Sequence, residues 1–201
     1  MIASSLYLFL ESLLRGISNG ASSLIQGLSL GLLSNAALER LTEHRYATSF
    51  SSYAEESYVN SGFFIWEREA IRRYFPPGGR ILVAAAGAGR EMLALAHDGF
   101  LVAGFDCCAP LVEAGRNELR KQGIEAKLEY APPSTVPEAD VHYDAVLVGF
   151  SGYMYIVGRV RRINFLRELC RFLTPGAPLM ISFTEGSSGR RRVWTARIGT
   201  A

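Results

Sequence analysis

Residues 80–183 alternate between short strand-like runs and longer amphipathic segments. The runs are RILVAAA, FLVAGFD, EAKLEY, YDAVLVGF and LMISF, at 80–86, 100–106, 125–130, 143–150 and 179–183. Helical spacing fills most of the segments between them, which end at turn signals: Gly99, Gly123 and Thr174-Pro175-Gly176. Strands buried on both faces are apolar almost throughout, as most of these runs are. The alternation therefore predicts an α/β fold, a Rossmann-like, doubly wound, mostly parallel sheet with helices on both faces.

A further helix is predicted upstream of the first run. The stretch SGFFIWEREAIRRYFPPGGR opens near Ser61 and closes at Pro76-Pro77-Gly78-Gly79, which is a strong stop signal. Four residues recur at helical spacing and are expected to face the core: Trp66, Ala70, Ile71 and Tyr74. We accordingly divide the chain into a helical or irregular N-terminal extension, 1–60, and a Rossmann-like domain, 61–201.

The N-terminal extension contains an uncharged stretch over residues 16–38. It is long enough to cross a bilayer, but its many Ser, Gly, Asn and Gln residues are atypical of a spanning helix. We expect a helical pair that packs on the domain, with Leu24, Ile25, Leu28 and Leu32 on one face. Two alternatives stay open, a contact of residues 1–38 with a membrane surface and a contact between copies of the chain. No basic segment and no cleavage site typical of a secretory signal accompany the first residues, so a cytoplasmic location is expected.

Charge and cysteine content argue against several classes of partner. The chain has 21 Lys and Arg against 19 Asp and Glu, which does not favour nucleic acid, and the GRRR cluster at 189–192 is too small to change that. The cysteines, Cys107, Cys108 and Cys170, are odd in number and indicate free thiols in a reducing compartment. Because no zinc-type spacing is present, no metal site is expected.

Small residues occupy the junction between the first predicted strand and its helix, in the order Ala84-Ala85-Ala86-Gly87-Ala88-Gly89. Ligands of open parallel sheets bind at the carboxyl ends of the strands, and side chains this small let a ligand lie against the backbone. The second strand ends in Asp106, whose carboxylate can accept two hydrogen bonds from a ribose diol. The two features together predict a cofactor that contains a nucleoside. The alternative is that the small residues serve only helix–strand packing.

The glycine spacing helps to choose among nucleoside cofactors. A dinucleotide fingerprint counted from Ala85 would place its third glycine at position 90, which is Arg90. The spacing Gly-x-Gly-x-Gly fits Ala85, Gly87 and Gly89 with one substitution, and no Walker pattern follows. Arg90 therefore disfavours a nicotinamide-dependent oxidoreductase.

The stretch RILVAAAGAGREMLALAHDGFLVAGFDCCAPLVEAGRNEL resembles the first two motifs of class I S-adenosylmethionine-dependent methyltransferases. The stretch YDAVLVGFSGYMYIVGRVRRINFLRELCRFLTPGAPLMISF is similar to their later core. The resemblance covers about residues 61–184, and YAEESYVNSGFFIWE resembles the entry segment of uncharacterised bacterial members. It implies S-adenosyl-L-methionine as cofactor and methyl transfer to a small-molecule acceptor.

The resemblance also assigns cofactor-binding residues. Ala85, Gly87 and Gly89, with Ala86 in the same turn, would line the methionine and ribose side, and Asp106 would hold the ribose hydroxyls. The remaining assignments are Cys107 and Leu111 beside the adenine, Ala131 to Ser134 at its edge, and Phe150 and Ser151 facing the methyl group and the acceptor.

The chain departs from the family pattern at several positions. An acidic residue is common at the position of Val83, a glycine at Ala85, and another acidic residue after the third strand, where Ala131-Pro132 stands. Residues 184–201 are too short for the usual helix and two strands. Either this is a truncated or natural short form, or a partner completes the sheet edge. The N-terminal helices or association between copies of the chain could cover that edge.

Residues for the acceptor site are aromatic or amide side chains, and no catalytic base is evident. The candidates are Tyr53, Tyr58, Asn60, Tyr153 and Tyr155, for which simple packing is the alternative. His97 and His142 are expected to be structural or exposed, whereas His44 could reach the pocket. A predicted helix begins with three cationic residues, Arg159, Arg161 and Arg162, although positive charge is unfavourable at the N-terminus of a helix dipole. This indicates either an anionic partner or a solvated face. A non-catalytic binding or assembly module with this fold is the alternative function.

Overall fold

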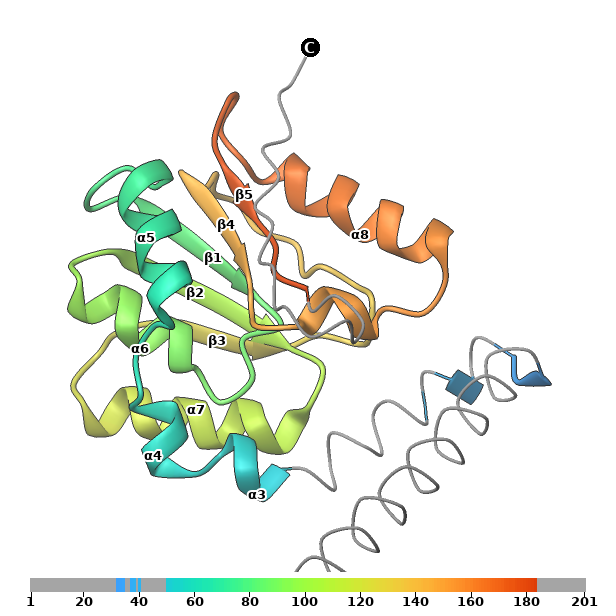
Figure 1. Ribbon diagram of the computed structural model, residues 1–201, viewed down its shortest axis with the longest axis horizontal. Coiled ribbons are helices and arrows are strands. Elements are labelled where there is room, and N and C mark those ends of the chain that lie inside the picture. The colour runs from blue at the N-terminus through green and yellow to red at the C-terminus, as the bar shows by residue number, and fades with distance from the viewer. Residues whose placement is uncertain (1–31, 35–36, 39, 41–49, 184–201) are drawn as a thin grey trace, which may run out of the picture. The chain divides into compact units, whose positions relative to one another are not determined.

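The computed structural model describes residues 32–34, 37–38, 40 and 50–183. The chain divides into two compact units, Met1–Arg40 and Leu41–Ala201, and the second contains the sheet (Figure 1). Its first described elements are the short helices α3 (Phe50–Tyr53) and α4 (Glu56–Val59). The predicted domain boundary at residue 60 stays a prediction. His44, most of residues 16–38 and all of 184–201, including GRRR, lie outside the described residues.

Five parallel strands form the sheet in the order β3-β2-β1-β4-β5. Their bounds are β1 Arg80–Ala84, β2 Leu101–Asp106, β3 Lys127–Tyr130, β4 Ala145–Val148 and β5 Leu179–Met180. In register, Ala84 pairs with Phe105 of β2 and with Val148 of β4. The carboxyl ends of the three central strands therefore meet at one edge, and the predicted fold is confirmed.

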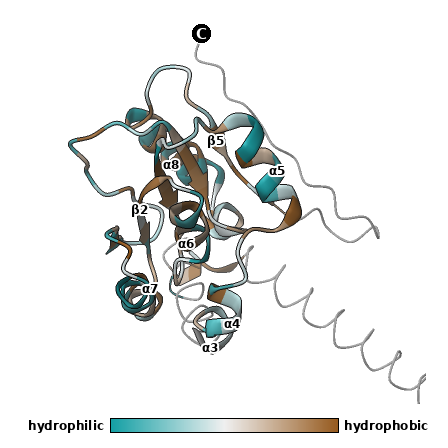
Figure 2. Cartoon of the chain, turned by 90° about the vertical axis from the view of Figure 1, so that its left-hand side faces the viewer, coloured by the Kyte–Doolittle hydropathy of each residue, from teal (hydrophilic) through white to brown (hydrophobic). Residues whose placement is uncertain are grey.

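Helices cover both faces of this sheet (Figure 1). α5 (Ile65–Tyr74), α6 (Arg90–His97) and α7 (Ala109–Lys121) pack on one face, and α8 (Arg159–Arg171) packs on the other. Successive β1 residues alternate between the two apolar cores: Ile81 and Val83 belong to the first, Leu82 and Ala84 to the second. Figure 2 shows hydrophobic strands between helices whose outer faces are largely hydrophilic.

α5 differs in two respects from its prediction. It begins at Ile65 rather than near Ser61, because the Glu67 carboxylate accepts the N–H of Phe64 at 2.8 Å and fixes the start there. Ala70 and Ile71 are buried and Trp66 partly so, but the prediction for Tyr74 is wrong, since 40% of it is exposed. The helix ends at Tyr74. The backbone of Phe75 is extended, and the ring of Phe75 is buried in the core instead of the ring of Tyr74.

In the part of the chain that the structure describes, every helix is too short or too polar to span a lipid bilayer.

Candidate functional site

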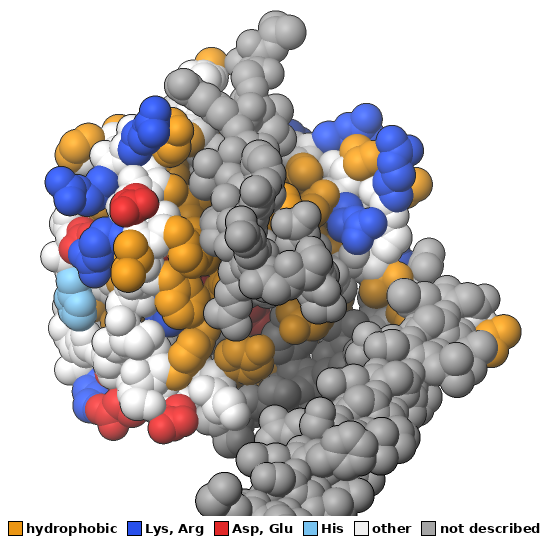
Figure 3. Space-filling model, in the orientation of Figure 1, with side chains coloured by type: hydrophobic (Ala, Val, Ile, Leu, Met, Phe, Trp, Pro, Cys, Tyr) orange, Lys and Arg blue, Asp and Glu red, His pale blue; other side chains and the backbone are white. Residues whose placement is uncertain are grey.

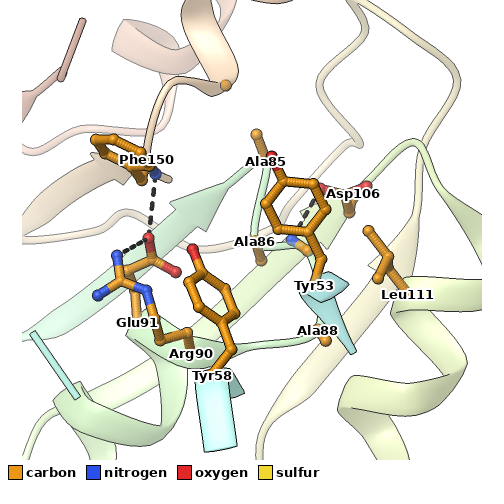
Figure 4. A pocket seen from close by; sticks show the side chains of 12 residues that line it. Tyr53, Tyr58, Ala85, Ala86, Ala88, Arg90, Glu91, Asp106, Leu111 and Phe150 are labelled. Atoms are coloured by element: carbon orange, nitrogen blue, oxygen red, sulfur yellow. Dashed lines mark hydrogen bonds and ion pairs between the residues drawn. The ribbon is translucent and has the colours of Figure 1, made fainter. Parts of the chain in front are cut away.

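A partly open pocket with a cavity volume of about 50 Å³ lies at the carboxyl ends of β1, β2 and β4 (Figure 4). Its walls come from the short helices α3 and α4, the turn after β1, the start of α6, and the segments after β2 and β4. The lining residues are Tyr53, Tyr58, Ala85, Ala86, Gly87, Ala88, Arg90, Glu91, Asp106, Leu111, Phe150 and Gly152. The edge that the sequence predicted to bind a ligand thus contains a cavity.

The turn after β1 presents bare backbone to this pocket. Ala85 and Gly87 have φ values of 53° and 54°, and Gly89, with φ 89°, precedes the first residue of α6. A Cβ atom built on Gly87 would meet no heavy atom within 4 Å. The space over Gly87 is therefore open, as the binding of a ligand against the backbone requires.

Asp106 lies across from this turn with its carboxylate held by backbone N–H groups. One oxygen accepts the N–H of Gly87 at 2.8 Å, and the other accepts the N–H of Cys108 at 2.8 Å. The side chain is 8% exposed, and this burial raises the pKa of Asp106 despite the hydrogen bonds from Cys108 and Gly87. Each oxygen has further acceptor capacity. Asp106 can accept hydrogen bonds from a diol in the pocket without losing either backbone contact.

A buried ion cluster behind the turn was not predicted from the sequence. Arg90 makes a bidentate pair with Glu67, at 2.9 and 2.7 Å, and contacts Glu91 at 2.7 Å. Its guanidinium also donates to the carbonyl of Gly62 at 2.6 Å and lies 4.3 Å from the Phe64 ring centroid. Burial alone would lower the pKa of Arg90, but the two carboxylates outweigh it and the pKa is raised. Arg90 thus ties the segment before α5 to the start of α6.

The cluster extends to the loop after β4 through Glu91. The same Glu91 oxygen that accepts from Arg90 also accepts the N–H of Phe150 at 3.1 Å. Gly149 approaches the β1 turn so closely that a Cβ on it would overlap the carbonyl oxygen of Ala85. Glu91 therefore joins the start of α6 to the loop after β4. The sequence signal for this cluster was two charged residues opening an otherwise apolar helix, REMLALAH.

Two of the predicted acceptor-site tyrosines line the pocket. The rings of Tyr53 and Tyr58 meet edge to face at 5.9 Å, and burial raises the pKa of both hydroxyls. Tyr155 lies in the 3₁₀ helix η1 (Gly152–Tyr155), 43% exposed, and interacts electrostatically with Tyr53. Tyr153 packs against the core on the α8 face. Asn60 is not brought to the pocket, because its amide donates to Glu118 of α7 at 3.1 Å.

Among the predicted cofactor residues, the pocket brings together Ala85, Ala86, Gly87, Asp106, Leu111 and Phe150. The others lie next to it rather than in its walls: Gly89, Cys107, Ala131 and Ser151. Ala131 is buried, with its N–H donating to the carbonyl of Asp106 at 3.0 Å, and the N–H of Ser151 donates to Ser182 at 3.2 Å. These backbone contacts fix the positions of Ala131 and Ser151 beside the pocket.

The two described histidines lie away from the pocket, and the arginines that open α8 are not among its lining residues. His97 ends α6 and His142 precedes β4, both exposed and at the opposite ends of their elements from the pocket. Of the arginines that open α8, Arg159 is exposed and Arg161 and Arg162 are partly buried; an anionic partner for them stays a prediction. Over residues 50–183 and the few described before them, no three His, Cys, Asp or Glu side chains come together as metal ligands.

The chain is similar to a family of known proteins. Residues 81–176 match the family model described as a methyltransferase domain. Uncharacterised proteins of Mycobacterium bovis and Mycobacterium tuberculosis are 31% identical over 116 residues, which is 57% of this chain and 41% of theirs. The chain therefore spans less than half the length of these relatives.

Solved structures of methyltransferases share the fold. A methyltransferase of Methanosarcina mazei has a TM-score of 0.54 at 21% identity, covering 62% of this chain and 60% of that one. An amino pentose methyltransferase of Micromonospora echinaspora with S-adenosylmethionine bound has a TM-score of 0.51 at 22% identity, covering 63% and 53%. A glycopeptide N-methyltransferase complexed with sinefungin has a TM-score of 0.52 at 21% identity, covering 67% and 65%.

Proposed function

The chain contains a class I S-adenosylmethionine-dependent methyltransferase domain, and from this premise we propose that it transfers a methyl group from S-adenosyl-L-methionine to a small-molecule acceptor. The observation that carries the proposal is the pairing of open backbone at Gly87 with the Asp106 carboxylate across from it. These two groups suit a nucleoside, whose sugar needs both a hydrogen-bond acceptor and close approach to the chain.

The residues of the pocket divide the binding of such a cofactor among them. Asp106 accepts hydrogen bonds from the ribose hydroxyls, and Leu111, which is buried in the same wall, offers an apolar surface to the adenine. The turn from Ala85 to Ala88 leaves room for the methionine part. The bound cofactor supplies a sulfonium methyl group that a nucleophile can displace, so the protein provides position and electrostatics.

The mouth of the pocket suits an acceptor with an apolar part. Phe150, Met154 and Tyr155, all on the β4–η1 segment, are 39%, 42% and 43% exposed. Figure 3 shows hydrophobic side chains gathered on the middle of the face seen in Figure 1, and basic side chains gathered over α8. The hydroxyls of Tyr53 and Tyr58, whose pKa values burial raises further, stay protonated at neutral pH, so neither offers a deprotonated base. The acceptor atom that we propose therefore has a lone pair of its own, as in a neutral amine.

Calorimetry with the full chain tests the cofactor part of this proposal. We expect S-adenosylmethionine and S-adenosylhomocysteine to bind, and Asp106→Ala to weaken both about a hundredfold, because two hydrogen bonds to a charged group are lost. Asp140→Asn, at an exposed position in the loop before β4, is the control. Absence of binding at high micromolar concentration by folded protein would overturn the proposal, and NADH titrated by fluorescence tests the competing cofactor.

Turnover is tested separately from binding. Incubation with S-adenosylmethionine carrying a labelled methyl group, together with pools of small amines, thiols and phenols, should give a labelled product by mass spectrometry. Cofactor binding with no transfer to any pool would instead support the non-catalytic binding module.

A further inference from the structure

Glu91 has a carboxylate oxygen that makes no hydrogen bond within residues 50–183. One oxygen accepts both hydrogen bonds found for this side chain, from Arg90 at 2.7 Å and from the N–H of Phe150 at 3.1 Å. No hydrogen bond from the described residues reaches the second oxygen, although Glu91 is only 4% exposed. Figure 4 shows this oxygen turned away from Phe150 and toward the side of the pocket where Tyr58 lies.

The charges around Glu91 leave this oxygen in a negative environment. Arg90 is the cation of the pocket wall, and its bidentate contact with Glu67 already neutralises it. Glu91 and Asp106 both line the pocket, and their charges interact. A buried carboxylate that keeps an unused acceptor position favours a cation that can donate a hydrogen bond.

The rings beside Glu91 favour the same kind of ligand. Tyr58 and Phe150 line the pocket on either side of the carboxylate (Figure 4). The faces of aromatic rings attract cations, and the attraction grows when water is excluded. An ammonium group satisfies both demands, because it carries a positive charge and three donors.

We propose that Glu91 is an ammonium-binding residue, whose second carboxylate oxygen accepts a charge-assisted hydrogen bond from a primary ammonium group of a bound ligand. The inference rests on the proposed function, which offers two sources of this group. One is the amino group of the methionine part of the cofactor, and the other is an ammonium group of the acceptor at an atom other than the one that receives the methyl group.

Glu91→Gln removes the charge with little change of shape. The glutamine carbonyl oxygen can keep the hydrogen bonds from Arg90 and Phe150, and the amide NH₂ then replaces the acceptor that faces the pocket. The matched control is Glu69→Gln, at an exposed position on α5. Thermal unfolding establishes that both variants are folded. Should Glu91→Gln not fold, Glu91→Asp, which withdraws the oxygen while keeping the charge, provides the same comparison.

Two ligands that share a nucleoside distinguish the cofactor source. S-adenosylhomocysteine has the amino-acid part, and 5′-methylthioadenosine has a neutral thioether without it. If the cofactor supplies the ammonium group, Glu91→Gln weakens S-adenosylhomocysteine about tenfold by calorimetry, the loss of one charge-assisted hydrogen bond, and leaves methylthioadenosine unchanged. Glu69→Gln changes neither affinity.

The acceptor source is tested with protein saturated with S-adenosylhomocysteine. If an acceptor amine is the ligand, n-butylammonium raises the unfolding temperature of this complex, and Glu91→Gln abolishes that rise while both nucleoside affinities stay unchanged. Equal weakening of both nucleosides would show a merely structural role and overturn the proposal, as would no effect in any of these measurements. Failure of the wild-type protein to bind either nucleoside would instead overturn the proposed function.

Discussion

The carboxylate of Asp106, at the end of β2, accepts a hydrogen bond at 2.8 Å from the N–H of Gly87, in the turn after β1. The contact joins two strand ends and turns the carboxylate toward the open space over the glycine. Substitution of Gly87, or removal of the Asp106 charge, should therefore affect ligand binding more than folding.

Gly87→Ala is expected to weaken cofactor binding through the methyl group it adds to the pocket. Gly78, in the turn before β1, has the same kind of backbone, with φ 69° and open space around a built Cβ. Both alanine substitutions should cost about 1–2 kcal/mol of unfolding free energy, because non-glycine residues are strained at positive φ. Only Gly87→Ala should reduce the affinity for S-adenosylhomocysteine. Equal affinities of the two variants would contradict a ligand lying over Gly87.

The affinity for the cofactor should fall at acidic pH. Burial raises the pKa of Asp106 above that of an ordinary aspartate, about 3.9. Ribose binding uses the ionised carboxylate, so the ligand lowers this pKa and its binding releases a proton. Affinity is therefore full above the raised pKa and declines as the pH falls through it, beginning at a higher pH than an ordinary aspartate would give. Calorimetry in buffers of different ionisation enthalpy measures the proton release.

Asp106→Asn is the companion measurement for this pH dependence. The variant should bind the cofactor more weakly than the wild type at neutral pH. Its affinity should not fall further as the pH is lowered. A wild-type affinity that stays constant from neutral pH down to the ordinary aspartate range would contradict the assignment.

Ala85→Gly should stabilise the fold slightly. Ala85 has φ 53°, in the left-handed region that costs a residue with a Cβ about 1–2 kcal/mol. Part of this gain is offset because glycine loses more backbone entropy on folding, so a net increase of roughly 0.5 kcal/mol in unfolding free energy is expected. Urea denaturation measures it. A clear loss of stability would show that the Ala85 methyl group makes packing contacts worth more than the strain.

Breaking the buried pair of Arg90 and Glu67 should be strongly destabilising. The two side chains are 2% and 1% exposed, so Glu67→Gln leaves the Arg90 charge without its main partner and should cost about 3–5 kcal/mol. The double variant Glu67→Met with Arg90→Met should cost less than the sum of its two single changes, because no unpaired charge remains.

The control for this double-mutant comparison is Glu113→Gln, which removes an exposed ion-pair partner that lies 3.6 Å from Arg120. Surface pairs contribute less than about 1 kcal/mol, so little change is expected. Urea denaturation of all variants at one pH gives the comparison, and strict additivity of the Arg90 and Glu67 substitutions would contradict direct coupling.

The sequence by itself determined the sheet, its connections and the ligand edge. Strand periodicity, glycine stops and the small residues from Ala84 to Gly89 are local signals, and right-handed parallel connections leave few topologies open. That Asp106 faces the turn around Gly87 followed, since β1 and β2 are adjacent and the turn and the aspartate stand at their carboxyl ends.

Only the tertiary structure decided which side chains line the pocket and how their charges are paired. Arg90, Glu67 and Glu91 come from two helices, and their contacts depend on how α5 packs against α6, which no local pattern encodes. Asn60 turned to α7 and Tyr74 to solvent because competing partners and the end of a helix outweighed their spacing. Periodicity fixes which residues share a face of one element, whereas contacts between elements depend on packing and hydrogen bonding across the whole core.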